Sequence, residues 1–306
     1  MDLSSLMPWR WPQLDSKRTR AARAAYDDTG RYDLYHDYCR WVAPRGGDSA
    51  AAESLLRDGY DIVTVLDEAR AADMKCRLLA EGAAGGRLKE DVTFADVVAF
   101  ADAAALRRTL DEVLRRAVDE RIAAFFGCEY LVYSALMMRT HPVETEERSL
   151  LWHCDRGPRD FLKLNLFFDS TAEHGSTTEM LALEESKAFE RAGYTFGPSK
   201  RRVADLARLA GRIGIGTPIA HRPLAAGQAF LFLPSRVLHR GIPPNRGIRH
   251  MLSLMLIPSP VPWRVAYDRM AEERFAESNL GGWLPDAGAL LRKLRVDAEL
   301  PSAAGG

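Results

Sequence analysis

Two residues near the middle of the chain, His153 and Asp155, could together bind a metal ion. They are separated by one residue in WHCDR, and side chains two positions apart on a strand lie on the same face. Such a pair often arises by chance, so a metal site needs a third ligand from another part of the chain. Two histidines and one carboxylate form the facial arrangement that holds Fe(II) and leaves coordination positions open.

His239 is the best candidate for the third ligand. It follows the apolar segment QAFLFLP and begins the turn HRGIPPNRG, 86 residues after His153. In an eight-stranded jelly roll the second and seventh strands lie close together, so a His-x-Asp on one strand can meet a histidine on the other. His174, in AEHGS, is more typical of a turn. The remaining histidines are His36, His141, His221 and His250.

Two apolar strands carry a second group of polar residues. In GIRHMLSLMLI, alternation places Arg249 and Ser253 on one face and the leucines on the other, which we expect to contact helices. Arg249 would then point into the core, where a buried guanidinium requires an anionic partner such as a dicarboxylate. In FLKLNLFF, Lys163 and Asn165 share one face of an apolar strand. We expect these four residues to bind a co-substrate.

Each of these assignments has an alternative. Arg249 could instead form an ion pair with Asp169 or Glu179. Lys163 could extend its ammonium to the edge of the barrel, and Asn165 could hydrogen-bond the backbone.

Three further residues are candidates for contact with a substrate. Arg139 and Arg156 could hold an acidic group, and Trp152 could stack on the substrate. The alternatives are a solvated rim for the two arginines and simple packing for the tryptophan.

We expect the segments that carry these residues to form one domain. After the leader we expect the strand YDIVTVL, a helix capped by Asp67, and more helix from Thr93 onward. The predicted segments are an irregular leader (1–47), a mainly helical part that packs on the core (48–127), the core itself (128–262) with a helical insertion (around 184–213), and C-terminal helices (263–306).

The period of the apolar residues changes from 3.6 to two after Gly127. Eight short strands with turns between them and helices on either side predict an α+β fold. Its core would be a double-stranded β-helix, the cupin-like jelly roll. The strand segments are EYLVYSALMMRT, LLWHCD, FLKLNLFF, STTEMLAL, TPIAHRPL, QAFLFLP, VLHRGI and IRHMLSLMLI.

Composition limits the class of partner. The 306 residues include 42 Lys plus Arg and 42 Asp plus Glu, so the zero net charge favours neither nucleic acid nor an anionic membrane. The four cysteines have no paired short spacing, which suggests a reducing compartment. The first residues contain no apolar signal-peptide core and no apolar run reaches 18 residues, so we expect a cytoplasmic protein.

Three segments in order resemble the non-haem Fe(II), 2-oxoglutarate-dependent oxygenases, and within them the phytanoyl-CoA dioxygenase-like group. They are LLRDGYDIVTVLDEARAADMKCRLL, WHCDRGPRDFLKLNLFFDSTAEHGSTTEML and LHRGIPPNRGIRHMLSL, and the resemblance extends from about residue 55 to 260. It implies that His153, Asp155 and His239 are the iron ligands. It also implies that Arg249 binds the distal carboxylate of 2-oxoglutarate.

The chain departs from this family pattern at two places. Arg249 follows His239 one residue sooner than expected, so Arg246 remains a competitor for the carboxylate. MLALEESKAF stands where the family has Gly-Ser-His, on the substrate side. Some related enzymes hold 2-oxoglutarate with a lysine on the strand after the His-x-Asp, which keeps Lys163 as a third candidate.

The resemblance implies a dioxygenase that uses Fe(II), 2-oxoglutarate and O2, releases succinate, and hydroxylates or desaturates a small molecule. Halogenating relatives replace the metal-binding carboxylate by a small residue, so Asp155 favours these outcomes over halogenation. A natural product is the favoured substrate, with an acyl intermediate left open, and the oligomeric state is not fixed by the sequence. The alternatives are an iron enzyme of this fold that does not use 2-oxoglutarate, and a non-catalytic jelly-roll binding module.

Overall fold

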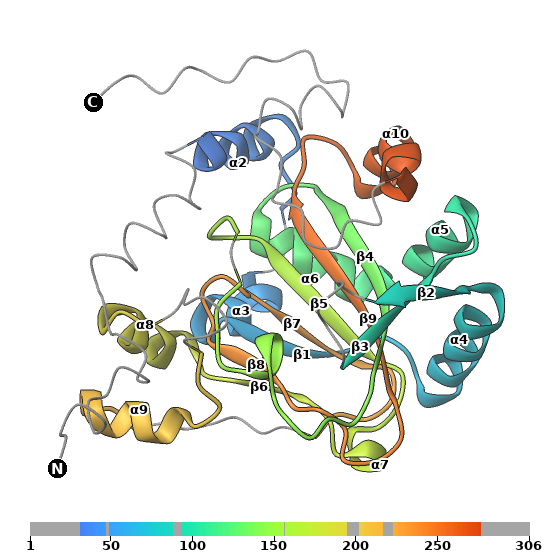
Figure 1. The fold of residues 1–306 in the computed structure, drawn as a ribbon. Coiled ribbons are helices and arrows are strands. Elements are labelled where there is room, and N and C mark those ends of the chain that lie inside the picture. Colours follow the sequence, from blue (N-terminus) through green and yellow to red (C-terminus); the bar gives the residue numbers. More distant parts are fainter. Residues whose placement is uncertain are drawn as a thin grey trace, which may run out of the picture.

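A seven-stranded antiparallel sheet forms the centre of the molecule, with most of the helices on one face and a small two-stranded sheet on the other (Figure 1). The computed structural model describes residues 31–46, 49–87, 94–155, 157–194, 202–216 and 223–276. None of the helices in these ranges is long and apolar enough to cross a membrane.

The large sheet has the strand order β1-β7-β5-β9-β4-β3-β2, and the small sheet pairs β6 with β8. The strands of the large sheet are β1 (Tyr60–Thr64), β2 (Ala83–Arg87), β3 (Ala95–Ala99), β4 (Tyr130–Thr140), β5 (Leu162–Phe167), β7 (Gln228–Phe232) and β9 (Arg249–Pro258). Those of the small sheet are β6 (Thr178–Met180) and β8 (His239–Gly241).

Helices surround the sheets, and most of them precede β4 in the chain. They are α2 (Arg31–Val42), α3 (Glu53–Asp58), α4 (Glu68–Glu81), α5 (Ala103–Val113), α6 (Arg116–Phe126), α7 (Thr171–His174), α8 (Leu183–Arg191), α9 (Leu206–Ile213) and α10 (Trp263–Ala276). Two short 3-10 helices are η3 (Ser49–Ala52) and η4 (Arg148–Leu150).

Local signals explain where the first elements begin and end. Asp67 caps α4, because its side chain accepts a hydrogen bond from the Arg70 amide at 2.8 Å. Gly59 ends α3 in the left-handed conformation with φ 79°, and a Cβ there would lie 2.5 Å from Val237 Cγ2. The sharp turn between α3 and β1 therefore requires glycine.

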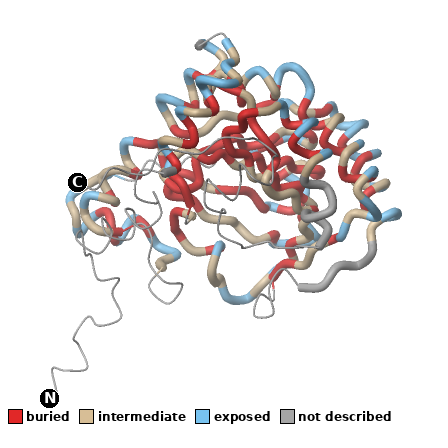
Figure 2. The backbone as a smooth tube through the Cα atoms, turned by 90° about the horizontal axis from the view of Figure 1, so that it is seen from above, coloured by how far each residue is buried: buried red, intermediate tan, exposed pale blue. Residues whose placement is uncertain are grey.

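The two faces of β9 have different environments, as the alternation predicted. Leu252, Leu254 and Leu256 are fully buried in the main hydrophobic core, together with side chains from the helices. Arg249 and Ser253 lie on the opposite face. In Figure 2 the buried positions occupy the middle of the molecule, and the exposed ones lie on its outer turns.

Mixed helices and antiparallel sheets confirm the α+β class, and the arrangement is compatible with the predicted jelly-roll core. The helix predicted from Thr93 is wrong, because β-branched Val97 and Val98 lie in strand β3, which pairs with β4. Two helices, α5 and α6, precede Gly127, and Arg115 between them has an extended backbone. The N-terminal part thus contributes β1, β2 and β3 to the sheet as well as helices.

Several predicted segments differ in extent or fall outside the described residues. The segment LLWHCD forms only the single bridge at His153 rather than a full strand. The predicted leader up to residue 30, most of the strand TPIAHRPL and the C-terminal helix ALLRKLRV lie outside the described ranges.

Asp169, which follows β5, connects the helical layer to the sheet. One carboxylate oxygen accepts from Lys75 Nζ of α4 at 2.5 Å, and the other accepts from His250 Nδ1 of β9 at 2.8 Å. Burial alone would raise the pKa of Asp169, but the hydrogen bonds from His250 and Lys75 outweigh it and lower the pKa to about 2. A carboxyl whose folded pKa is depressed stabilises the fold above its unfolded pKa, near 4, and this contribution disappears as pH falls toward 2.

We predict that Asp169→Asn lowers the free energy of unfolding by about 2 kcal/mol at pH 7, because Lys75 and His250 lose their anionic partner. Urea unfolding followed by circular dichroism measures the difference. Between pH 4 and pH 2 the difference from the unmutated protein should shrink. The control is Asp73→Asn, which changes an exposed carboxylate on α4 and should leave stability unchanged. Equal stability of the two variants would contradict the role of Asp169.

Candidate metal centre

Backbone pairing brings His153 and His239 together. The His153 amide donates to the His239 carbonyl and the His239 amide donates to the His153 carbonyl, each at 3.0 Å. On its other side, His239 of β8 pairs with Met180 of β6. The Asp155 amide donates to the Pro234 carbonyl at 2.7 Å, which fixes the end of the His-x-Asp segment.

A second hydrophobic core anchors the same segments from behind. Trp152 and Cys154 alternate with the two candidate ligands and point into this core, where Leu238 and residues of α8 and α9 join them. The remaining members are Leu181, Phe189, Tyr194, Leu206, Leu209 and Ala210. His153 and Asp155 therefore face the opposite way, toward the large sheet.

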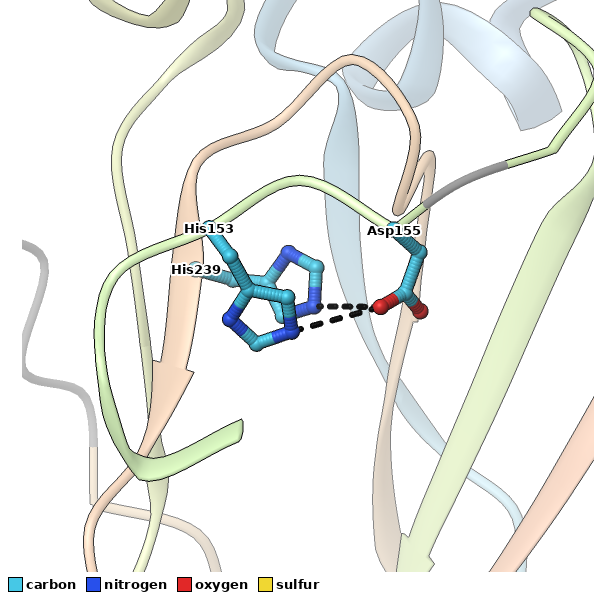
Figure 3. Close-up of side chains that lie close together, drawn as sticks. All are labelled: His153, Asp155 and His239. Atoms are coloured by element: carbon cyan, nitrogen blue, oxygen red, sulfur yellow. Dashed lines mark ion pairs between the residues drawn. The ribbon is translucent and has the colours of Figure 1, made fainter. Parts of the chain in front are cut away.

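The three predicted ligands converge on one point. His153 Nε2 lies 3.2 Å and His239 Nε2 lies 3.9 Å from Asp155 Oδ1, and Figure 3 shows both imidazoles turned toward this oxygen. One ligand atom from each residue lies within 4.8 Å of the others. The chain thus has a His-Asp-His metal-binding site.

The protonation of the two imidazoles suits metal binding. His153 Nδ1 donates to the Leu151 carbonyl at 2.7 Å and His239 Nδ1 donates to the Val237 carbonyl at 2.9 Å. Since a carbonyl can only accept, Nδ1 carries the proton and each neutral ring presents the lone pair of Nε2. Burial lowers the pKa of His153, and burial together with the neighbouring His153 lowers the pKa of His239 to about 3.

The carboxylate of Asp155 is ionised and partly accessible. Burial would raise its pKa, but the charge of Lys163 opposes this effect and holds that pKa well below its usual range. Its side chain is 24% exposed, whereas those of His153 and His239 are 4% and 7% exposed. Two nitrogen donors and one oxygen donor, open on one side, fit a divalent transition metal with free coordination positions.

Arg249 is buried and has only neutral hydrogen-bond partners among the described residues. Its Nη1 donates to Ser176 Oγ at 3.0 Å and its Nη2 donates to Thr140 Oγ1 at 3.0 Å. Nη1 also contacts the carbonyls of Thr177 and Ile242, and Nε has no partner in the described part of the chain. Burial lowers the pKa of Arg249 to about 10. The alternative ion pairs are absent, because Asp169 binds Lys75 and Glu179 binds Arg240.

The guanidinium of Arg249 lies along the strand that carries His239. Its contact at the Ile242 carbonyl is three residues beyond His239, and three residues of strand advance by about 10 Å. Gly241 lies between them on the same face as His239, and a Cβ there would be 4.0 Å from Arg249 Nη2. Gly241 places no side chain between the metal-binding site and the guanidinium.

The other residues predicted to bind a co-substrate are Ser253, Asn165 and Lys163. The first two bind each other, and Lys163 binds Asp155 of the triad. Ser253 Oγ donates to Asn165 Oδ1 at 2.8 Å, and both side chains are buried. Lys163 Nζ donates to Asp155 Oδ2 at 2.6 Å, so it reaches the metal-binding carboxylate instead of the barrel edge.

The structure places the remaining candidates away from the triad. Arg139 makes two hydrogen bonds to Asp96, at 2.7 and 2.9 Å, opposite His250 on the other face of the sheet. Trp152 is packed in the second core. The predicted substrate contacts of Arg139 and Trp152 are therefore wrong, because Arg139 binds Asp96 and Trp152 is packed in the core. Arg156 lies outside the described residues.

Arg246 and His174 belong to the surroundings of α7. The guanidinium of Arg246 is exposed and donates to the Glu173 and Ala172 carbonyls at the end of this helix. His174 accepts from the Ser176 amide in the following turn. Neither residue belongs to the triad.

Sequence reasoning missed Thr140 and Ser176, the two hydroxyls that hold Arg249. Thr140 ends the alternating segment EYLVYSALMMRT, and it lies opposite Arg249 once β4 is paired with β9. Only the pairing of β4 with β9 indicates that Thr140 contacts Arg249. Ser176 comes from the loop after α7, where no periodicity exists to mark it.

No protein-family model matches the chain, and no curated protein matches it. Similar solved structures include the epimerase SnoN in complex with Fe3+, alpha ketoglutarate and nogalamycin RO, at 16% identity and a TM-score of 0.47, covering 68% of this chain and 82% of that chain. EctD from S. alaskensis, with 2-oxoglutarate and 5-hydroxyectoine, has 17% identity and a TM-score of 0.48 over 68% and 75% of the two chains. AviO1 from Streptomyces viridochromogenes Tue57 has 20% identity and a TM-score of 0.44 over 72% and 99%.

We predict that His239→Ala weakens binding of Co(II), a spectroscopic probe for this ligand set, by about 100-fold or more, because one of three donors is lost. Titration followed in the visible spectrum measures the affinity. The control is His141→Ala, since His141 contacts Asp96 and is not part of the triad. Equal Co(II) affinity of the His239 variant and the unmutated protein would rule out this metal site.

Proposed function

We propose that the protein is a non-haem Fe(II)- and 2-oxoglutarate-dependent dioxygenase that hydroxylates or desaturates a small molecule and converts 2-oxoglutarate to succinate. One observation carries the proposal: beside three convergent donors lies a buried guanidinium that has no anionic partner among the described residues. The guanidinium contacts the Ile242 carbonyl, and the backbone advances by about 10 Å from His239 to Ile242. The order of the three sequence motifs supports the phytanoyl-CoA dioxygenase-like group, with a single catalytic domain.

His153, Asp155 and His239 would hold the iron, which supplies the activation of dioxygen. The protein's own contribution is orientation. The backbone carbonyls of Leu151 and Val237 fix both imidazoles with Nε2 toward the metal position. The partly exposed side of Asp155 leaves room for the co-substrate and dioxygen.

Arg249 would bind the distal carboxylate of 2-oxoglutarate. A buried guanidinium surrounded by hydroxyls and carbonyls gains a charge-assisted hydrogen bond when a carboxylate arrives, which offsets its desolvation. A five-carbon dicarboxylate bound at the metal by one end spans the distance that Gly241 leaves free. Arg246 lacks this environment because its side chain is exposed and bonds the end of α7.

The substrate side of the site favours an apolar molecule. Leu136, Met138 and Met255 lie on the same face of the sheet as Ser253, and each is only partly buried. Together with the zero net charge of the chain, these side chains support a natural-product or acyl substrate over a strongly charged one.

We predict that Asp155→Ala abolishes succinate formation in anaerobically iron-loaded protein exposed to 2-oxoglutarate and oxygen, because the only anionic ligand of the triad is lost. Succinate is measured by mass spectrometry. Asp73→Ala, which removes an exposed carboxylate on α4, serves as the matched control and should retain turnover. Full turnover in the Asp155 variant would refute the metal assignment.

We predict that Arg249→Met raises the KM for 2-oxoglutarate by about 100-fold, which corresponds to the loss of a charged hydrogen bond. Arg246→Met should leave this KM within twofold of the unmutated value, because Arg246 only caps α7. Initial rates of succinate formation give both values.

The Arg249 variant and the metal affinity of the unmutated protein separate this proposal from its two alternatives. Unchanged turnover in Arg249→Met, with no effect of 2-oxoglutarate on the Co(II) spectrum, would favour an iron enzyme that uses another co-substrate. Absence of any binding of Fe(II), Mn(II) or Co(II) at micromolar concentration would favour a non-catalytic binding module.

A further inference from the structure

The two carboxylate oxygens of Asp155 have different partners, because Lys163 binds one of them. Its ammonium lies 2.6 Å from Oδ2, whereas Oδ1 faces the two imidazoles at 3.2 and 3.9 Å. The carboxylate thus has one oxygen already bonded and one directed at the metal position.

The register of β5 explains why Lys163 reaches this carboxylate. Lys163 lies between Met255 of β9 and Phe232 of β7, and neither side chain offers an oxygen acceptor to an ammonium. The ring of Phe232 lies 5.1 Å from the ring of His239, which places this row of the sheet directly beneath the triad. Lys163 is 23% exposed, so its charge is only partly hydrated and the nearby carboxylate stabilises it.

Lys163 is distant from the guanidinium proposed to bind the distal carboxylate. Met255, its neighbour on β9, is six residues from Arg249, which corresponds to about 20 Å of strand. A five-carbon dicarboxylate bound at the metal and at Arg249 extends away from Lys163. Lys163 therefore lies at the metal end of the site, and Arg249 lies at the end proposed to bind the distal carboxylate.

We propose that Lys163 is a positioning residue that holds Oδ2 of Asp155, so that the carboxylate offers a single oxygen to the metal and the metal keeps its positions for the co-substrate. The inference rests on the metal site of the proposed function. It replaces the expectation that Lys163 binds 2-oxoglutarate.

The charge of Lys163 has two opposite effects, and these make the role measurable. Without metal, the ammonium stabilises a carboxylate that would otherwise be poorly hydrated. With metal, the same ammonium repels the divalent cation and competes with it for the negative charge of the carboxylate. Removing the charge should therefore destabilise the metal-free protein and strengthen metal binding.

Full-length Lys163→Met tests this inference, because methionine keeps the apolar stem without the charge. We expect a lower melting temperature of the metal-free protein and about tenfold tighter binding of Co(II) and of Mn(II) alone. We also expect a lower kcat for succinate formation with the KM for 2-oxoglutarate within threefold of the unmutated value. Lys163→Arg keeps the charge and should restore the metal affinity.

Lys75→Met is the matched control. Lys75 also pairs with a carboxylate, that of Asp169 on the helical face of the sheet. This variant should also lower the melting temperature but leave the Co(II) and Mn(II) affinities unchanged.

Two results would overturn the inference: unchanged or weaker metal binding by Lys163→Met, or a KM for 2-oxoglutarate raised tenfold or more. The second result would assign Lys163 to the co-substrate. Failure of the unmutated protein to bind Co(II) would instead refute the proposed function itself, so the two failures are distinguishable.

Discussion

The antiparallel pairing of His153 with His239 is the constraint on which the site depends. Two backbone hydrogen bonds of 3.0 Å place the two residues directly opposite each other, although they are 86 positions apart in the sequence. Each imidazole then bonds the carbonyl two residues before it, Leu151 in one case and Val237 in the other. Both metal-binding nitrogens are consequently oriented by backbone geometry. A small hydrophobic core behind the paired segments keeps this geometry fixed.

The large sheet separates two sets of charges. On its helical face, Asp169 accepts hydrogen bonds from Lys75 and His250. These contacts connect the helical layer to the sheet. On the site face Lys163 is paired with Asp155, while Arg249 has only hydroxyls and carbonyls among the described residues. A buried guanidinium without an anion is costly unless a ligand supplies one. This asymmetry between the faces supports the proposal that Arg249 binds a carboxylate.

Alternation and capping allowed much of the fold to be predicted. The strand faces of β9, the cap at Asp67 and the end of α3 at Gly59 all depend on neighbouring residues, so the sequence contains their signals. Strand β3 was mistaken for helix because it is short and lies among alanines that also favour helix. Its place depends on pairing with β4, and a partner so far along the chain leaves no local signal.

The spacing of His153 and Asp155, the later His239 and the face on which Arg249 lies could be predicted from the chain alone. A period of two fixes these directions whatever the strand pairs with. The pairing of Lys163 with Asp155 and of Arg139 with Asp96 could not be predicted in this way. Long charged side chains reach several potential partners, and the partner is chosen by the register between strands and by which acceptors lie close in space. These distances arise only when distant parts of the chain are packed together.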